Sequence, residues 1–238
     1  MKFLKVILFC FSLLALQSFS FSNVSINSGT ENISGSTTLS KEASQLYESL
    51  QLKDRGLSQQ AFSAALKAMR AVSGDLTNCE VITIADFSQS CNSKRLYIID
   101  LVNSQVLFQT YVAHGRNSGE EFATSFSDKP SSYKSSLGCY ITGDSYIGAN
   151  GYSLRLEGKE PGYNHHAFDR AVVLHGANYV SEDFIQSNGR LGRSLGCPAV
   201  PFELTKPIIE TIKNGSCFFI YYPDQRYFKT SALMKSAA

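Results

Sequence analysis

The stretch VITIADFSQSCNSKRLYIIDLVNSQVLFQTYVAHG, residues 81–115, decides the fold class of this 238-residue chain. Three runs in it are rich in β-branched and aromatic residues, at 81–87, 95–101 and 105–115. That composition is typical of β-strands. The pair Asn103-Ser104 separates the second run from the third, and a two-residue polar spacer of this kind predicts a hairpin turn.

Further strands are predicted downstream. The same composition recurs in LGCYITG (137–143), YSLRLEG (152–158), AVVLHG (171–176) and CFFIYYP (217–223). Two short helices are expected between them, one beginning near Ser181 and one over residues 205–213. Many short strands with few helices favour a β-sandwich or barrel over a parallel α/β sheet. We therefore predict a mainly β domain over residues 77–225.

The first residues predict export. Lys2 and Lys5 precede an apolar run from Val6 to Leu16, and small residues follow it. A basic start, a short apolar run and small residues are the parts of a secretory signal peptide, which we assign to residues 1–22. The run is too short for a comfortable membrane span. An exported mature protein without stable membrane insertion is therefore expected.

The segments at either end of the main domain are predicted as follows. Residues 23–39 are rich in Ser, Asn, Gly and Thr, which is typical of a flexible linker. Residues 40–76 are predicted to be helical, with Ser40 as a candidate N-cap. Their apolar residues at helical spacing are Phe62, Ala65, Leu66, Met69 and Val72. This stripe is expected to pack on the main domain, and residues 226–238 are expected to form a loose tail.

Charge excludes one class of partner. Removing residues 1–22 takes away two lysines and no acidic residue, so the formal charge falls from +2 to zero. Nucleic-acid-binding proteins carry a basic surface that neutralises phosphates. We therefore expect no nucleic-acid partner.

Cysteine content argues against a full disulfide framework. Of six cysteines, Cys10 lies in the predicted signal peptide. The remaining five are Cys79, Cys91, Cys139, Cys197 and Cys217. Cys79 and Cys91 flank the strand predicted at 81–87, whose ends lie more than ~20 Å apart, whereas a disulfide requires Cα atoms within about 7 Å. We do not expect that pair to be bonded, and pairing among the four cysteines other than Cys197 stays open.

The stretch GRSLGCPAV, residues 192–200, places Cys197 in a polar, glycine-rich loop. Buried structural cysteines prefer apolar neighbours, so this setting favours a nucleophile. A cysteine nucleophile needs a base. His175 is the best placed of the four histidines, because it closes an apolar strand and Gly176 permits a sharp turn after it. We therefore predict a Cys197–His175 pair.

The same loop predicts how an acyl-transfer reaction would be assisted. Gly196 permits a positive φ, so the N–H groups of Gly196 and Cys197 are expected to point at an oxyanion. Arg190 and Arg193 are expected to lower the pKa of the thiol and to attract an anionic substrate.

No metal or cofactor is expected. His165 and His166 are adjacent, and neighbouring side chains on an extended chain point to opposite faces, so we do not expect them to bind zinc together. The sequence contains no HExxH or CxxC motif. The group that orients His175 stays open between Asn178, Tyr179 and a backbone carbonyl.

The segment VVLHGANYVSEDFIQSNGRLGRSLGCPAVP (172–201) resembles the signature of the L,D-transpeptidase catalytic domain (YkuD-type), in which a strand ending in His-Gly precedes Ser-x-Gly-Cys. It is most similar to the murein L,D-transpeptidase branch of that family. Residues 111–143, 145–158 and 214–224 are similar as well, so the resemblance covers roughly 78–224. One departure is Leu195, which stands where the commoner motif has a histidine.

This resemblance implies an L,D-transpeptidase-like β-sandwich or barrel with a few short helices. It makes Cys197 the acylated nucleophile and His175 its base. The backbone at Gly196 and Cys197 would form the oxyanion hole, with Ser194 and Gly176 shaping the loops. The residues expected to bind substrate are Arg193, Arg190, Arg116 and His114.

The implied chemistry is acyl transfer on peptidoglycan stem peptides. The thiolate attacks the amide between an L-centre and the following D-alanine, D-alanine leaves, and an amine of a second stem forms a 3→3 cross-link. The implied location is periplasmic or cell-wall associated. Attack by water would make the protein an L,D-carboxypeptidase or another thiol hydrolase. A non-catalytic wall-binding β-domain is the alternative from a different class, and the oligomeric state stays open.

Overall fold

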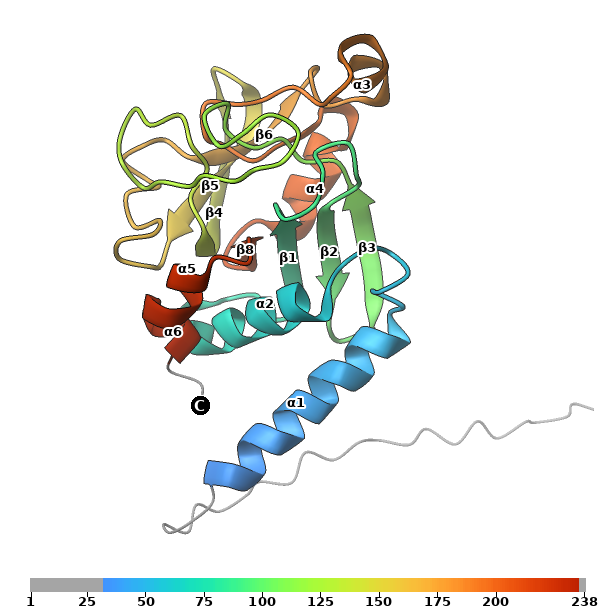
Figure 1. The fold of residues 1–238 in the computed structure, drawn as a ribbon, viewed down its shortest axis with the longest axis vertical. Coiled ribbons are helices and arrows are strands. Elements are labelled where there is room, and N and C mark those ends of the chain that lie inside the picture. The colour runs from blue at the N-terminus through green and yellow to red at the C-terminus, as the bar shows by residue number, and fades with distance from the viewer. Residues whose placement is uncertain (1–31, 236–238) are drawn as a thin grey trace, which may run out of the picture.

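The computed structural model describes residues 32–235 (Figure 1). The predicted signal peptide and residues 23–31 of the predicted linker lie outside the described residues. Within the described part, no helix combines the length and apolar character needed to cross a membrane.

One sheet of eight strands organises the described chain, in the order β3-β2-β1-β8-β4-β5-β6-β7. The strands are β1 (Val81–Asp86), β2 (Leu96–Asp100), β3 (Gln105–Thr110), β4 (Gly138–Gly148), β5 (Gly151–Gly158), β6 (Val173–Ala177), β7 (Ala199–Pro201) and β8 (Cys217–Tyr221). Neighbours are antiparallel except in the β1–β8 and β6–β7 pairs, which are parallel. The mainly β fold is confirmed.

The two edges of the sheet meet through the segment that follows β3. The third predicted strand, 105–115, ends as a regular strand at Thr110, and the chain then crosses to the opposite edge. There the Ala113 N–H donates to the Ala199 carbonyl of β7 at 2.8 Å. This contact gives the sheet its barrel-like closure. Strand β7 was not predicted from the sequence, because a segment of three residues that ends in proline is too short to show the alternation or composition of a strand.

Helix α2 (Gln59–Ala71) packs its apolar stripe under the sheet, as predicted (Figure 1). The side chain of Ser58 caps it by accepting a hydrogen bond from the Ala61 N–H at 3.1 Å. All five residues of the predicted stripe are buried. Burial of such a stripe supplies most of the stability of a short helix.

The prediction of a flexible linker is wrong over residues 32–39. Helix α1 (Asn32–Ser49) includes these residues and so begins well before the expected N-cap, Ser40. Extending a helix adds one hydrogen bond for each residue fixed, and the segment contains no proline to stop it.

The remaining helices lie at loops between strands and at the C-terminus. They are α3 (Glu182–Asn188), α4 (Thr205–Ile212), α5 (Gln225–Thr230) and α6 (Ala232–Lys235), with 3-10 turns η1 (Ser73–Asp75) and η2 (Phe202–Leu204). Helices α3 and α4 match the two predicted helices. Ser181 caps α3 by accepting the Phe184 N–H at 3.1 Å.

The predicted loose tail, 226–238, is wrong up to residue 235. Helices α5 and α6 occupy it, and Tyr227 and Met234 are buried. The anchor is the buried carboxylate of Glu160, which accepts hydrogen bonds from the Tyr227 hydroxyl at 2.8 Å and from the Ser231 hydroxyl. Burial raises the pKa of Glu160. Glu160 lies far from the tail in sequence, so no local pattern could predict this attachment.

All five cysteines in the described residues are free thiols. Cys79 is exposed and Cys91 is buried, and β1 begins just after Cys79. The absence of a Cys79–Cys91 bond in this part of the chain agrees with the expectation. The Cys139 and Cys217 sulfurs lie 3.7 Å apart on the neighbouring strands β4 and β8.

The attachment of the C-terminal helices gives a stability prediction. Tyr227→Phe removes one of the two donors to Glu160 Oε1, which keeps its hydrogen bond from the Cys139 N–H, so the free energy of unfolding should fall by about 0.5–1.5 kcal/mol. Urea denaturation followed by circular dichroism measures the change. Tyr222→Phe is the control, because the Tyr222 hydroxyl makes no hydrogen bond within the described residues. Equal stability of the two variants would contradict the anchoring role.

Candidate active site

The candidate base, His175, lies in the middle of β6, which pairs with β5 on one side and β7 on the other. Its side chain is only 5% exposed. The next residue must be glycine, because a Cβ on Gly176 would lie 2.0 Å from the Thr205 hydroxyl oxygen. The close packing of Gly176 against Thr205 therefore holds β6, and with it His175, in a fixed position.

The imidazole of His175 has the hydrogen-bonding arrangement of a base. Its Nδ1 lies 3.0 Å from the Gly176 carbonyl oxygen, which can only accept, so Nδ1 carries the hydrogen and Nε2 keeps its lone pair. Burial lowers the pKa of His175, so the ring is neutral at neutral pH. Of the three groups considered for orienting His175, the backbone carbonyl makes this contact.

Cys197 lies in the loop that leads into β7. In the parallel β6–β7 pair His175 is opposite Ala199, and the His175 N–H donates to the Pro198 carbonyl at 3.4 Å. Cys197 precedes these partners by one and two residues, and its sulfur accepts the Val173 N–H of β6 at 3.5 Å. The predicted base and nucleophile are thus on paired segments.

The thiol does not hydrogen-bond to the His175 ring in the described structure. Its S–H instead points to the Ala171 carbonyl oxygen, 3.7 Å from the sulfur. Burial raises the pKa of Cys197, while the Val173 N–H and the charge of Arg170 act to lower it. Thiol and imidazole are therefore both neutral, and catalytic hydrogen bonds often tighten only when substrate binds.

Ser194 and Gly196 shape the Cys197 loop. The Ser194 hydroxyl donates to the Cys197 carbonyl at 2.6 Å and accepts the Gly196 N–H at 3.0 Å. Gly196 has a φ of +128°, and a Cβ there would lie 2.9 Å from the Lys134 carbonyl oxygen. Glycine is therefore required. The Gly196 N–H is already hydrogen-bonded to Ser194. The Cys197 N–H makes no hydrogen bond in the described chain, so it is the donor available to an oxyanion.

The segment after β3 supports this loop from the other side. The Ser194 N–H donates to the His114 carbonyl at 3.0 Å, and the Arg116 N–H donates to the Ser194 carbonyl at 2.8 Å. Gly115 permits the close approach, because a Cβ there would lie 2.9 Å from the Gly196 Cα. The barrel-closing segment and the nucleophile loop thus hold each other in place.

His114 itself is fully buried, so the structure does not support its expected contact with substrate. Its Nδ1 lies 2.7 Å from the Arg95 guanidinium and its Nε2 lies 3.2 Å from the Gly119 carbonyl oxygen. Burial and the Arg95 charge lower the pKa of His114 to about 3. The neutral His114 ring therefore links Arg95 to the Gly119 carbonyl inside the fold.

The two arginines predicted to activate the thiol are paired elsewhere. Arg193 and Arg190 contact the two oxygens of the Glu120 carboxylate at 2.7 and 3.0 Å. Neither is among the charges that act on Cys197. Arg116 is exposed and lies over the Tyr133 ring, 4.3 Å from its centroid.

Arg170, rather than Arg190 or Arg193, is the arginine whose charge lowers the pKa of the thiol. Its side chain is 5% exposed and lies close enough to Cys197 to lower the pKa of the thiol. Its guanidinium donates to Ser127 O, Ser132 Oγ, Lys134 O and Ser136 Oγ. Arg170 was not predicted from the sequence, because the only local feature that marks it is its position just before an apolar strand.

Tyr179 is a second residue near the thiol. Burial and the charge on Cys197 raise the pKa of Tyr179 to about 12. Its ring packs against Gly192, where a Cβ would lie 2.5 Å from the tyrosine. The tyrosine therefore borders the nucleophile loop but does not contact the His175 ring by a hydrogen bond in the described residues.

Metal-ligating side chains do not converge on Cys197. In the described part of the chain, a group of three lies at Asp128, His165 and His166 instead. Nothing in the arrangement around the thiol calls for a metal, because a thiol and a neutral imidazole suffice for acyl transfer.

A family model for the L,D-transpeptidase catalytic domain matches residues 53–221, more than half of the chain. The chain belongs to this family. The match includes α2, which the sequence analysis had assigned to the separate segment 40–76. No curated protein matches.

Solved structures of L,D-transpeptidases resemble the chain distantly. One from Mycobacterium smegmatis has 13% identity and a TM-score of 0.38, covering 60% of this chain and 59% of its own. L,D-transpeptidase 3 from Mycobacterium tuberculosis has 12% identity and a TM-score of 0.39, with 60% and 61% covered. One from Xylanimonas cellulosilytica has 11% identity and a TM-score of 0.34, with 79% and 93% covered. The chain thus spans about three fifths of the first of these.

The electrostatics of this L,D-transpeptidase-family site predict the pH dependence of Cys197 alkylation. Because burial raises the pKa of the thiol above its ordinary value of 9.0, the rate with iodoacetamide should still increase above pH 9. Arg170→Gln should shift the curve to higher pH, and Arg170→Lys should shift it less. Peptide mass spectrometry of the Cys197 peptide follows the reaction.

Arg190→Gln is the matched control for that experiment, since Arg190 is paired with Glu120. It should leave the curve unchanged. A rate that reaches its plateau by pH 7, or a shift caused by Arg190→Gln and not by Arg170→Gln, would contradict this account of the site.

Proposed function

We propose that this chain is an exported murein L,D-transpeptidase that uses Cys197 as nucleophile and His175 as base. One observation carries the proposal. The Cys197 sulfur accepts a hydrogen bond from the Val173 N–H of β6, and Val173 is two residues before His175, whose ring is neutral and whose Nε2 lone pair is available. Family membership supports the same chemistry. The predicted signal peptide supports export to the periplasm or cell wall.

In the first half-reaction, the Cys197 sulfur attacks the carbonyl carbon between the L-centre of a stem peptide and D-alanine. His175 Nε2 takes the thiol proton and then gives it to the departing D-alanine nitrogen. The bond broken is the amide, and the bond formed is a thioester. The Cys197 N–H is the available backbone donor for the oxyanion.

In the second half-reaction, an amine of a neighbouring stem attacks the thioester carbonyl. His175 accepts a proton from this amine and returns it to the sulfur, so the enzyme is regenerated and a 3→3 cross-link is formed. Water in place of the amine would give a tripeptide. Peptidoglycan stem peptides are therefore the proposed donor and acceptor.

The proposal is tested with purified disaccharide-tetrapeptide and the full chain, with products analysed by mass spectrometry. The wild type should give 3→3-linked dimers and free D-alanine. His175→Ala should slow product formation about 10²–10⁴-fold, as expected for loss of a general base. Cys197→Ala should give none.

Cys79→Ala is the control, because Cys79 is an exposed thiol outside the site. It should retain wild-type activity. Tripeptide without dimers would move the assignment to an L,D-carboxypeptidase. If tetrapeptide and larger wall fragments were all left intact by the wild type, a wall-binding role would replace the enzymatic proposal.

A further inference from the structure

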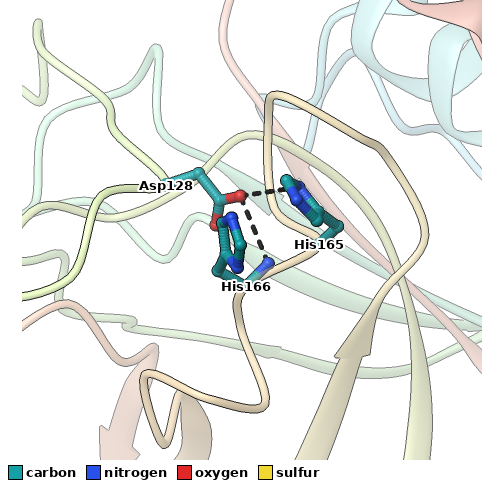
Figure 2. Close-up of side chains that lie close together, drawn as sticks. All are labelled: Asp128, His165 and His166. Carbon is teal, nitrogen blue, oxygen red and sulfur yellow. Dashed lines mark hydrogen bonds and ion pairs between the residues drawn. The ribbon is translucent and has the colours of Figure 1, made fainter.

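His165 and His166 lie on the same side of the chain, not on opposite faces (Figure 2). They belong to turns in the β5–β6 connection, where the Arg170 N–H donates to the His166 carbonyl at 2.9 Å. Their ring centroids are 3.8 Å apart. The chain forms turns at these residues and is not extended, so the prediction that the two side chains point to opposite faces is wrong.

The Asp128 carboxylate completes a group of three side chains that can bind a metal. One donor atom from each of Asp128, His165 and His166 lies within 4.8 Å of the other two. Asp128 Oδ2 and His165 Nδ1 lie 3.0 Å apart. Ligand atoms around a tetrahedral zinc with bonds of about 2.0–2.1 Å lie roughly 3.3 Å apart. The Asp128–His165 pair has this spacing, whereas the His166 ring makes no contact with the carboxylate within 4.0 Å in the described residues and has to move closer to bind the same ion.

A hydrogen bond from Gly162 gives His165 Nδ1 the unprotonated form that a metal ligand needs. The Gly162 N–H donates to His165 Nδ1 at 3.1 Å, so this nitrogen acts as an acceptor without a hydrogen. The same nitrogen faces the Asp128 oxygen, which also only accepts. A zinc ion bound here would replace the Gly162 N–H at the single lone pair of His165 Nδ1 and would also bind the Asp128 oxygen beside it.

The carboxylate is buried and held in place, whereas the imidazoles are accessible. The Asp128 side chain is 7% exposed, and its Oδ1 is buried without a hydrogen-bond partner, 3.6 Å from an Arg170 nitrogen. Its Oδ2 accepts the His166 N–H at 3.2 Å. The His165 and His166 side chains are 42% and 46% exposed. An ion can thus enter from solvent and find one fixed ligand.

We propose that Asp128, His165 and His166 form a zinc site. Two imidazoles with one carboxylate suit zinc, whereas magnesium and calcium prefer oxygen ligands alone. Three protein ligands leave a fourth position for water on the exposed side. The ion ties the β5–β6 connection to Asp128 and so steadies Arg170, which acts on Cys197.

Isothermal titration of the metal-free full chain with Zn²⁺ tests the proposal. One equivalent should bind to the wild type, and His165→Ala, His166→Ala and Asp128→Asn should each weaken binding at least tenfold. Asp183→Asn is the control, because Asp183 is an exposed carboxylate on α3 that contacts none of the three ligands in the described residues. It should change the affinity less than threefold.

Free thiols could also hold zinc, so Co²⁺ is used as a spectroscopic substitute. Ligation by imidazole and carboxylate predicts d–d absorption without a thiolate-to-metal charge-transfer band. Binding that is unaffected by both histidine variants, a thiolate band at one equivalent of Co²⁺, or no binding to the wild type would each overturn the proposal. Circular dichroism of each variant checks that it is folded.

Discussion

The parallel pairing of β6 with β7 is the constraint on which the candidate active site depends. It joins the His175 N–H to the Pro198 carbonyl and brings the Cys197 sulfur to the Val173 N–H. Strand β7 is short, so it needs support from its other side, and the segment after β3 supplies this through Ala113. The contacts that close the barrel therefore also assemble the candidate site.

Burial sets the electrostatics of this site. It raises the pKa of Cys197 and lowers that of His175, so both changes favour a neutral thiol beside a neutral base. The proposed reaction therefore requires proton transfer as the sulfur attacks, without a preformed ion pair. Among the described residues, Arg170 is the cation that lowers the pKa of the thiol. Backbone carbonyls and hydroxyls hold it, so its position does not depend on bound substrate.

The sequence was sufficient to predict the features that local patterns encode. The strand composition, the α2 stripe and the family resemblance all rest on short segments, and so does the hypothesis that His175 and Cys197 act as a pair. It could not predict contacts made across the fold, such as those of Arg170 or the attachment of Tyr227 to Glu160. For the same reason the pairing of Arg190 and Arg193 with Glu120 could not be predicted from their proximity to Cys197 in sequence.

The central claim is that Cys197 carries the acyl group. Intact-protein mass spectrometry after brief mixing with disaccharide-tetrapeptide tests it most directly. We expect an adduct equal in mass to the disaccharide-tetrapeptide minus D-alanine, located on Cys197 and released by hydroxylamine, as a thioester is. An adduct on another residue, or an equal adduct on the Cys197→Ala variant, would contradict it.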